Sequence, residues 1–155
     1  MRPGIEEILK KVRIYELPQR AVSMVDMSTP LGEVYRLLDE EHSVAVLVLE
    51  EKKLVGIFTE RDILYRTALE GDPATPIGEL MTRDAVTLRP DDRLAEAIAV
   101  MTEKGIRHLP IVSAKGETGL IGGRDVLRLI ADYYPETVLN LPPRLNQKMS
   151  RPEGG

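Results

Sequence analysis

The spacing of hydrophobic and polar residues changes several times along the chain, and each change predicts a new element. Short runs rich in Val, Leu and Ile predict β-strands at 22–25, 43–49, 54–58, 85–88, 108–112 and 119–122. Between them, apolar residues recur at three- and four-residue spacing, which predicts helices at 31–41, 60–69, 94–104 and 124–134. A short amphipathic helix is expected at 4–12.

Turn-forming residues separate these segments. Pro90 breaks the pattern before the third long helix, where Asp91 or Asp92 is expected to be the N-cap, and Gly105 is expected to end that helix. The stretch EGDPATP, at 70–76, is typical of a linker because it holds a Gly and two Pro residues. We therefore predict units at 1–71 and 72–134, followed by an extended or disordered tail at 135–155.

The order of elements occurs twice. In the register that places Ile14 on Ile77, residues 14–68 align with 77–131 without a gap. Identical pairs recur throughout, among them Arg20 with Arg83, Gly56 with Gly119, Asp62 with Asp125 and Leu64 with Leu127. We therefore predict an α/β (α+β) protein made of two tandem β-α-β-β-α motifs. Units this small bury little surface alone, so we expect them to pack face to face with pseudo-twofold symmetry.

Composition limits the partners. The net charge of −4 over 155 residues disfavours nucleic acid and anionic membranes as partners. The longest aliphatic run, 44–49, is too short to cross a bilayer, and the N-terminus lacks the apolar run of a signal peptide. With no Cys, the chain has neither disulfides nor a thiolate nucleophile. We expect a cytoplasmic protein that acts without membrane or nucleic acid.

No catalytic motif stands out. The sequence lacks GxSxG, HExxH and GxxxxGK. Its two histidines, His42 and His108, fall at different points of the repeat and do not suggest a metal pair. We expect no enzymatic activity, no required cofactor and no metal site.

Three segments of the second copy carry a family resemblance. MTRDAVTL, GIRHLPIV and GLIGGRDVL occur in this order between residues 81 and 127. Together they resemble the CBS domain, the module named after cystathionine β-synthase, and the resemblance covers about residues 12–134. It implies a disc-like pair of motifs that binds an adenosine-containing ligand between them and regulates a partner. It also implies a homodimer.

The resemblance assigns the ribose to Asp62 and Asp125. A ribose presents two adjacent hydroxyls, and one carboxylate can accept hydrogen bonds from both. Gly56, six residues before Asp62, is expected to let the strand run close to the ligand. Thr59 offers a hydroxyl to the ribose or phosphate, whereas Gly122, at the same point of the second copy, does not.

The resemblance also implies that the carboxylate of one copy works with the strands of the other. Arg107 and His108 would then supply phosphate contacts to the Asp62 cleft. Ile57 and Val86 would line the adenine slot. The full set expected for nucleotide binding is Ile57, Thr59, Arg61, Asp62, Thr82, Val86, Thr87, Arg107, His108 and Asp125.

The opposite cleft, around Asp125, has fewer suitable residues. Its matching positions are Gln19, Met24, Val44 and Ala45, with no cation where Arg107 and His108 stand. We therefore predict one strong site, for AMP, ADP or ATP as a regulatory ligand, and one weak or vacant site.

Simpler interpretations remain open at each position. Asp62 and Asp125 could be helix N-caps, Thr59 a cap, His108 a partly buried strand residue and Arg61 a solvated one. The alternative function is a structural or interaction module with vestigial clefts, which holds a homodimer or an unidentified protein partner.

Overall fold

The computed structural model describes residues 3–18, 20–67 and 71–135. The elements of the first half are α1 (Ile5–Lys11), a 3-10 turn (Ile14–Glu16), β1 (Ser23–Asp26), α2 (Leu31–Glu40), β2 (Ala45–Glu50), β3 (Lys53–Thr59), α3 (Glu60–Asp62) and a π-helical segment (Ile63–Thr67). Those of the second half are a 3-10 turn (Ile77–Glu79), β4 (Thr82–Arg83), α4 (Leu94–Lys104), β5 (His108–Val112), β6 (Thr118–Gly122) and α5 (Gly123–Tyr133). The tail expected from 135 onward lies, beyond its first residue, outside the described residues.

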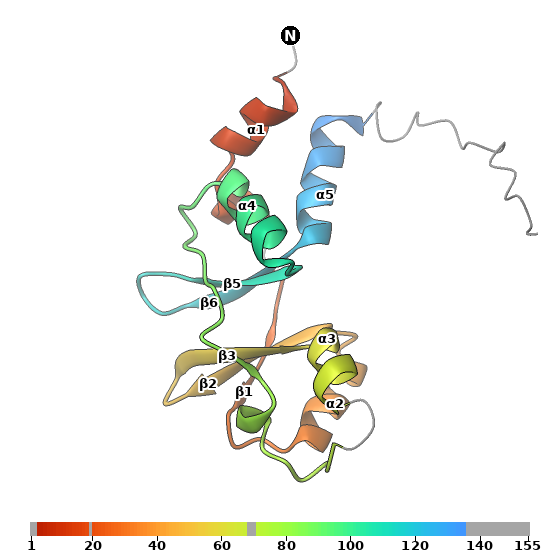
Figure 1. Cartoon of the computed structure of the whole chain (residues 1–155). Helices are drawn as coiled ribbons and strands as arrows, with labels where there is room; N and C mark the ends of the chain where they lie inside the picture. The colour runs from red at the N-terminus through yellow and green to blue at the C-terminus, as the bar shows by residue number, and fades with distance from the viewer. Residues whose placement is uncertain (1–2, 19, 68–70, 136–155) are drawn as a thin grey trace, which may run out of the picture.

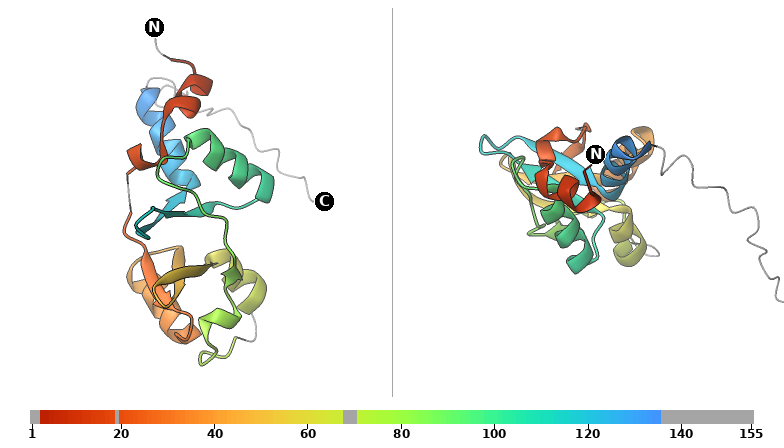
Figure 2. Two further views of the ribbon diagram at one scale, coloured as in Figure 1. Left: turned by 90° about the vertical axis from the view of Figure 1, so that its left-hand side faces the viewer. Right: turned by 90° about the horizontal axis from the view of Figure 1, so that it is seen from above.

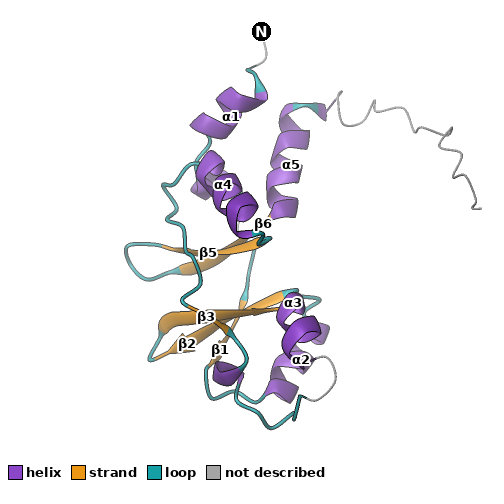
Figure 3. Ribbon diagram, in the orientation of Figure 1, coloured by secondary structure: helices purple, strands orange, loops and turns teal. Residues whose placement is uncertain are grey.

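The strands form two sheets that lie one above the other (Figure 1). The larger sheet has the order β1-β2-β3-β4, with β1 parallel to β2 and the other pairs antiparallel, and the smaller sheet pairs β5 with β6. Helices α1, α4 and α5 lie on the far side of the smaller sheet, and α2 and α3 accompany the larger one (Figure 3). The predicted α+β architecture of two motifs is confirmed.

A small apolar cluster joins the two sheets. Ala45, Leu47 and Ile57 of the larger sheet are buried there. Ala85 and Leu120 of the second copy pack against them. The burial of aliphatic side chains between the copies is the physical reason for their face-to-face packing.

The two spatial halves do not coincide with the two halves of the sequence. Ile14 and Leu17, which precede the strands of the first copy, are buried in the core of the second. Ile77 and Met81, which precede the strands of the second copy, are buried in the core of the first. The chain therefore crosses between the halves twice (Figure 2), and each half is completed by a segment that leads into the other.

The strand predicted at 85–88 is wrong. Only Leu88 pairs there, through a parallel bridge to Ile111. The neighbouring Thr82–Arg83 forms β4 with the first copy instead. Asp84, with φ of 49°, turns the chain between these two pairings, so the segment pairs with one half before the turn and with the other half at Leu88.

Helix α4 has the predicted bounds but not the predicted N-cap. Gly105 ends α4 in the left-handed conformation, with φ of 63°, as expected. Neither expected aspartate caps this helix, because Asp92 accepts a hydrogen bond from the backbone N–H of Arg89 at 2.7 Å. The N-cap is Arg93, whose backbone N–H donates to Glu96 at 2.7 Å. The helix predicted at 60–69 is α-helical only to Asp62 and then continues as a π-helix.

Candidate functional site

Asp62 and Asp125 occupy the same backbone frame in the two copies. Each follows a strand and accepts a hydrogen bond from the backbone N–H three residues earlier, at 2.9 Å from Thr59 and 2.8 Å from Gly122. The side chains are buried, with relative exposures of 8% for Asp62 and 5% for Asp125. One carboxylate oxygen of each, Oδ2, therefore caps the following helix. The other, Oδ1, faces different groups in the two copies.

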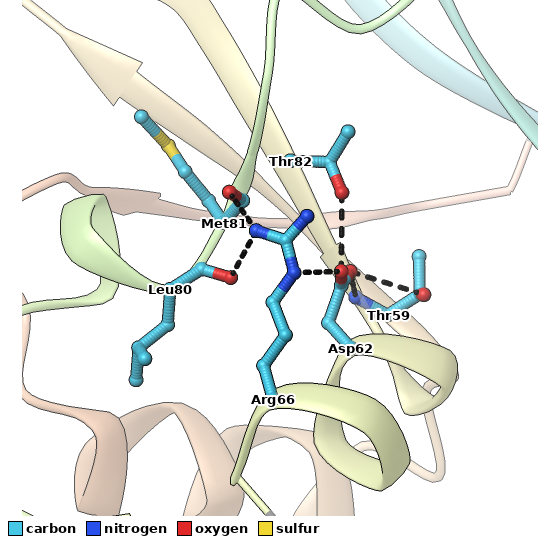
Figure 4. A network of polar contacts seen from close by, with 6 residues as sticks. All are labelled: Thr59, Asp62, Arg66, Leu80, Met81 and Thr82. Atoms are coloured by element: carbon cyan, nitrogen blue, oxygen red, sulfur yellow. Dashed lines mark hydrogen bonds and ion pairs between the residues drawn. The ribbon is translucent and has the colours of Figure 1, made fainter.

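Around Asp62 the additional partners are hydroxyls. Thr59 Oγ1 lies 3.3 Å from Oδ2, and Thr82 Oγ1 lies 3.1 Å from Oδ1 (Figure 4). Thr82 belongs to the second copy, so the expected combination of a carboxylate from one copy with a strand from the other is present here. Hydroxyls can turn to other partners, which leaves this carboxylate able to accept hydrogen bonds from a ligand.

Arg66 is a member of this network that sequence reasoning missed. Its Nε lies 3.5 Å from Asp62 Oδ1, and its Nη1 donates to the carbonyl oxygens of Leu80 at 3.2 Å and Met81 at 2.8 Å (Figure 4). The guanidinium thus ties the carboxylate to the segment that leads into β4. Its i,i+4 spacing from Asp62 on a predicted helix was the available signal.

Gly56 serves the approach of β4. A Cβ at this position would lie 2.5 Å from Met81 Sδ and 2.7 Å from the carbonyl oxygen of Thr82. The segment that leads into and begins β4 therefore leaves no room for a side chain at position 56. This close approach is what brings the Thr82 hydroxyl to Asp62.

Around Asp125 the additional partner is a cation. Arg20 Nε and Nη2 donate to Asp125 Oδ1 at 3.0 and 2.6 Å. The Arg20 side chain is 49% exposed and that of Asp125 is 5% exposed. Sequence reasoning missed Arg20, although its identity with Arg83 in the repeat marked the position. A positive charge therefore reaches Asp125 from Arg20, and not from the two positions that match Arg107 and His108 in the repeat.

Gly122 lies against the ring of His108. The two residues pair across β5 and β6. A Cβ at Gly122 would lie 3.3 Å from Cδ2 of His108 and 3.5 Å from both its Nε2 and Asp125 Oδ2. In the first copy the equivalent pair is Ala45 with Thr59. The missing hydroxyl is thus linked to the bulk of the opposite residue.

The ring of His108 lies between the copies. It was expected beside Asp62, whereas the structure brings it close to Asp125. Burial lowers the pKa of His108, and the positive charges of Arg20 and Arg107 lower it further, against the opposing effects of Glu60 and Asp125. The imidazole is therefore mainly neutral at pH 7.

The start of α3 touches the second copy. Arg61 Nη1 donates to the carbonyl oxygen of Gly105 at 2.7 Å, and its guanidinium lies 5.6 Å from the ring centroid of Tyr65. Gly105 precedes Arg107 by two residues, so this contact holds the beginning of β5 against α3. The start of α3 is thus in contact with the segment that leads into IRHLP.

The remaining predicted residues lie around this region. Arg107 and Thr87 are exposed, and Arg107 accepts the backbone N–H of Gly123 on its carbonyl at 3.0 Å. Val86 packs against the core of the second half, whereas Ile57 is buried between the sheets. The two residues expected beside adenine therefore belong to different apolar clusters.

A separate pocket of about 370 Å³ lies between α2 and α3. Residues expected for nucleotide binding do not line it. Its walls are Tyr35, Leu38, Asp39, His42, Ser43, Val44, Glu60 and Ile63.

Two further findings concern the described residues alone. Over 3–18, 20–67 and 71–135, His, Asp and Glu side chains form no group of three or more suited to a metal ion. In the same ranges no helix combines the length and apolar character that a bilayer crossing requires.

Comparison with known proteins points to one family. The family model described as the CBS domain matches residues 14–68 and 77–132. The CBS domain-containing protein CBSX3, mitochondrial, of Arabidopsis thaliana is 32% identical over 65% of this chain and 53% of its own length. The CBS domain-containing protein YhcV of Bacillus subtilis is 32% identical over 68% of this chain and 76% of its own. The chain thus spans about half of the first relative.

Solved structures share the fold. The CBS domain protein PAE2072 from Pyrobaculum aerophilum, complexed with AMP, superposes with a TM-score of 0.70 at 23% identity over 80% of this chain and 99% of its own. The CBS domain pair of protein MJ0100, in complex with 5′-methylthioadenosine and S-adenosyl-L-methionine, gives 0.69 at 22% identity over 78% and 97%.

Proposed function

Since this chain belongs to the CBS domain family, we propose that it is a regulatory CBS pair that binds an adenosine-containing ligand between its two halves. One observation carries the proposal: two buried carboxylates, Asp62 and Asp125, lie at equivalent strand-to-helix junctions near the surface where the copies meet. Each can offer Oδ1 to a ribose diol while Oδ2 caps its helix. Structural neighbours described as complexes with AMP, and with S-adenosyl-L-methionine and 5′-methylthioadenosine, support this ligand class.

The Asp62 cleft is proposed as the stronger site. Its carboxylate has hydroxyl partners and a long ion pair to Arg66, which a ligand can replace at moderate cost. Arg61 and Arg107 are proposed to supply donors to the phosphate. The imidazole of His108, which lies close to Asp125, is proposed to contact the nucleotide where it spans the two copies. The set proposed to contact the nucleotide is Ile57, Thr59, Arg61, Asp62, Thr82, Val86, Thr87, Arg107 and His108.

AMP, ADP or ATP is the proposed ligand. Arg61 and Arg107, the two arginines of the proposed contact set, suit phosphate oxygens because a guanidinium presents paired N–H donors. The ligand would span both copies and shift the equilibrium between their arrangements by its differential affinity. The change would then pass to a protein partner, in a cytoplasmic setting that suits a chain without cysteine. We propose no catalytic step.

A homodimer is proposed through the outer helices. Leu64 and Leu127 are equivalent in the repeat and are 70% and 68% exposed, and Tyr65 beside them is 78% exposed. Exposed apolar side chains repeated by pseudosymmetry suit a second copy of the chain. Sedimentation velocity of Leu64→Glu is expected to show monomers where the unsubstituted chain shows dimers, and unchanged dimers would contradict this surface.

A second candidate function is an interaction module whose clefts no longer bind ligand. The observation that favours it is the ion pair from Arg20, which already occupies Oδ1 of Asp125. This alternative predicts no response to any adenosine compound.

Thermal unfolding with AMP, ADP, ATP, S-adenosylmethionine and NAD, each at about 1 mM, separates the two functions. A ligand at a hundred times its dissociation constant stabilises the fold by about 2.7 kcal/mol, which raises the melting temperature by several degrees. A rise with AMP, ADP or ATP supports the regulatory pair. No rise with any compound contradicts it and favours the interaction module.

A further inference from the structure

The two candidate carboxylates differ in what a ribose must displace. At Asp125, Oδ2 is used by the backbone N–H of Gly122, and Oδ1 accepts two N–H groups of Arg20. A carboxylate has about four acceptor positions, so three are in use before a ligand arrives. A ribose diol needs two, and at least one Arg20 hydrogen bond has to be given up.

The side chains of Asp125 and Arg20 differ in how freely they can move. Asp125 is 5% exposed and anchored to the start of α5, whereas the Arg20 side chain is 49% exposed. Arg20 is therefore the partner that can move. When it leaves, its guanidinium loses a charge-assisted partner, and the cost depends on what replaces the carboxylate.

An uncharged nucleoside and a nucleotide differ in what they offer to the displaced Arg20 guanidinium. The ribose hydroxyls of an uncharged nucleoside satisfy Asp125 and offer nothing to the displaced guanidinium. A phosphate offers oxygens in the geometry that a guanidinium accepts in pairs. His108 beside Gly122 is mainly neutral, so Arg20 is the charged group in direct contact with Asp125.

We propose that Arg20 is a built-in competitor that closes the Asp125 cleft to uncharged nucleosides and admits nucleotides that carry phosphate. The inference rests on the proposed function and deepens it, because it names the residue that sets ligand class at the second cleft. At Asp62 a ribose meets two hydroxyls and a 3.5 Å ion pair to Arg66. The Arg66 guanidinium also donates to the carbonyl oxygens of Leu80 and Met81, so it keeps partners when the ribose binds, and this cleft accepts both classes.

Calorimetric titration of the full chain with AMP and with adenosine tests this, since the two share base and ribose. We expect AMP to fill two sites per chain and adenosine one. In Arg20→Gln, adenosine should gain the second site, and the second-site affinity for AMP should fall about ten- to a hundredfold. Arg83→Gln is the matched control, because Arg83 is the repeat equivalent and donates to the Gly78 carbonyl. It should behave as the unsubstituted chain does.

The unsubstituted chain provides a second measurement if Arg20→Gln folds poorly. The Nε–H signal of Arg20 in a ¹H–¹⁵N spectrum should shift on saturation with AMP and stay in place with adenosine. Adenosine filling two sites in the unsubstituted chain, or an Arg20 signal that adenosine shifts as much as AMP does, would overturn the role of Arg20 while leaving the proposed function intact. Absence of binding by either compound would overturn both.

Discussion

The surroundings of Asp62 and Asp125 share a backbone arrangement and differ in side chains. At the same joint the backbone N–H of Glu60 donates to Val44 and that of Gly123 donates to Arg107, at 3.1 and 3.0 Å. Yet Asp62 accepts hydrogen bonds from two hydroxyls and has a 3.5 Å ion pair to Arg66, whereas Asp125 accepts two hydrogen bonds from the Arg20 guanidinium. Duplication has preserved the main-chain frame that positions a carboxylate, while the partners that set its affinity have diverged.

A second difference lies one residue pair away. Thr59 faces Ala45 in the first copy, whereas Gly122 faces His108 in the second. Each pair combines one small residue with one larger residue. The loss of a hydroxyl and the gain of an imidazole are therefore one packing change, which moves a polar group from one strand to its neighbour.

The largest expected effect separates the two carboxylates. Asp62→Ala should weaken binding of AMP at the stronger site by about a hundredfold or more, because about two charge-assisted contacts to the ribose are lost. Asp125→Ala is the matched control and should leave that site within about threefold, as measured by titration calorimetry. The reverse order of effects would show that the assignment of the stronger cleft is wrong.

The packing difference predicts a smaller effect on stability. Gly122→Thr should lower the free energy of unfolding by about 1–3 kcal/mol, because its Cβ meets the ring of His108. The backbone itself tolerates a side chain, since φ at this residue is −120°. The measurement is urea unfolding at pH 7.

Adding His108→Ala to Gly122→Thr recreates the pair found in the first copy and supplies the control. The double variant should recover about 1 kcal/mol or more relative to the sum of the single changes. Strictly additive effects would mean that the two positions do not compete for space.

The smallest expected effect is a pH dependence. The pKa of His108 is lowered in the folded chain by burial and by Arg20 and Arg107, so the unfolded chain binds the proton more readily. Its contribution to stability is present above the unfolded pKa of about 6.5 and is lost as pH falls towards the folded pKa. The difference in free energy of unfolding between the unsubstituted chain and His108→Gln should therefore shrink or change sign between pH 8 and 5.

His42→Asn is the control for this pH series. His42 lies in an exposed turn with φ of 48°, a conformation that asparagine adopts readily. Its stability profile should run parallel to that of the unsubstituted chain. A profile for His108→Gln that also runs parallel would contradict the linkage.

Most of the fold could be predicted from the sequence because the repeat shows the hydrophobic pattern of each element twice. The aliphatic runs at β2, β3, β5 and β6 and the glycine that ends α4 act locally, so spacing was sufficient. The strand predicted at 85–88 is absent because β-pairing takes place at Thr82–Arg83, before the turn at Asp84, and afterwards only at Leu88. Which sheet a segment joins depends on tertiary packing, which strand propensity does not predict.

The candidate site was predicted in part for the same reason. Asp62, Thr59 and Thr82 meet, as the resemblance to the CBS domain implied. Arg20 and Arg66 were missed because long cations reach partners that depend on how the chain crosses between the halves. Aligning the two copies predicts where the backbone lies, but it does not predict which partners these long side chains contact.

The central claim is that a nucleotide lies in the Asp62 cleft with its ribose on that carboxylate. A crystal structure of the chain grown with AMP at about ten times its dissociation constant tests this most directly. The account predicts density at the first cleft with both ribose hydroxyls within about 3 Å of Asp62, in hydrogen-bond range. Density for AMP solely at Asp125, or solely away from both carboxylates, would contradict it.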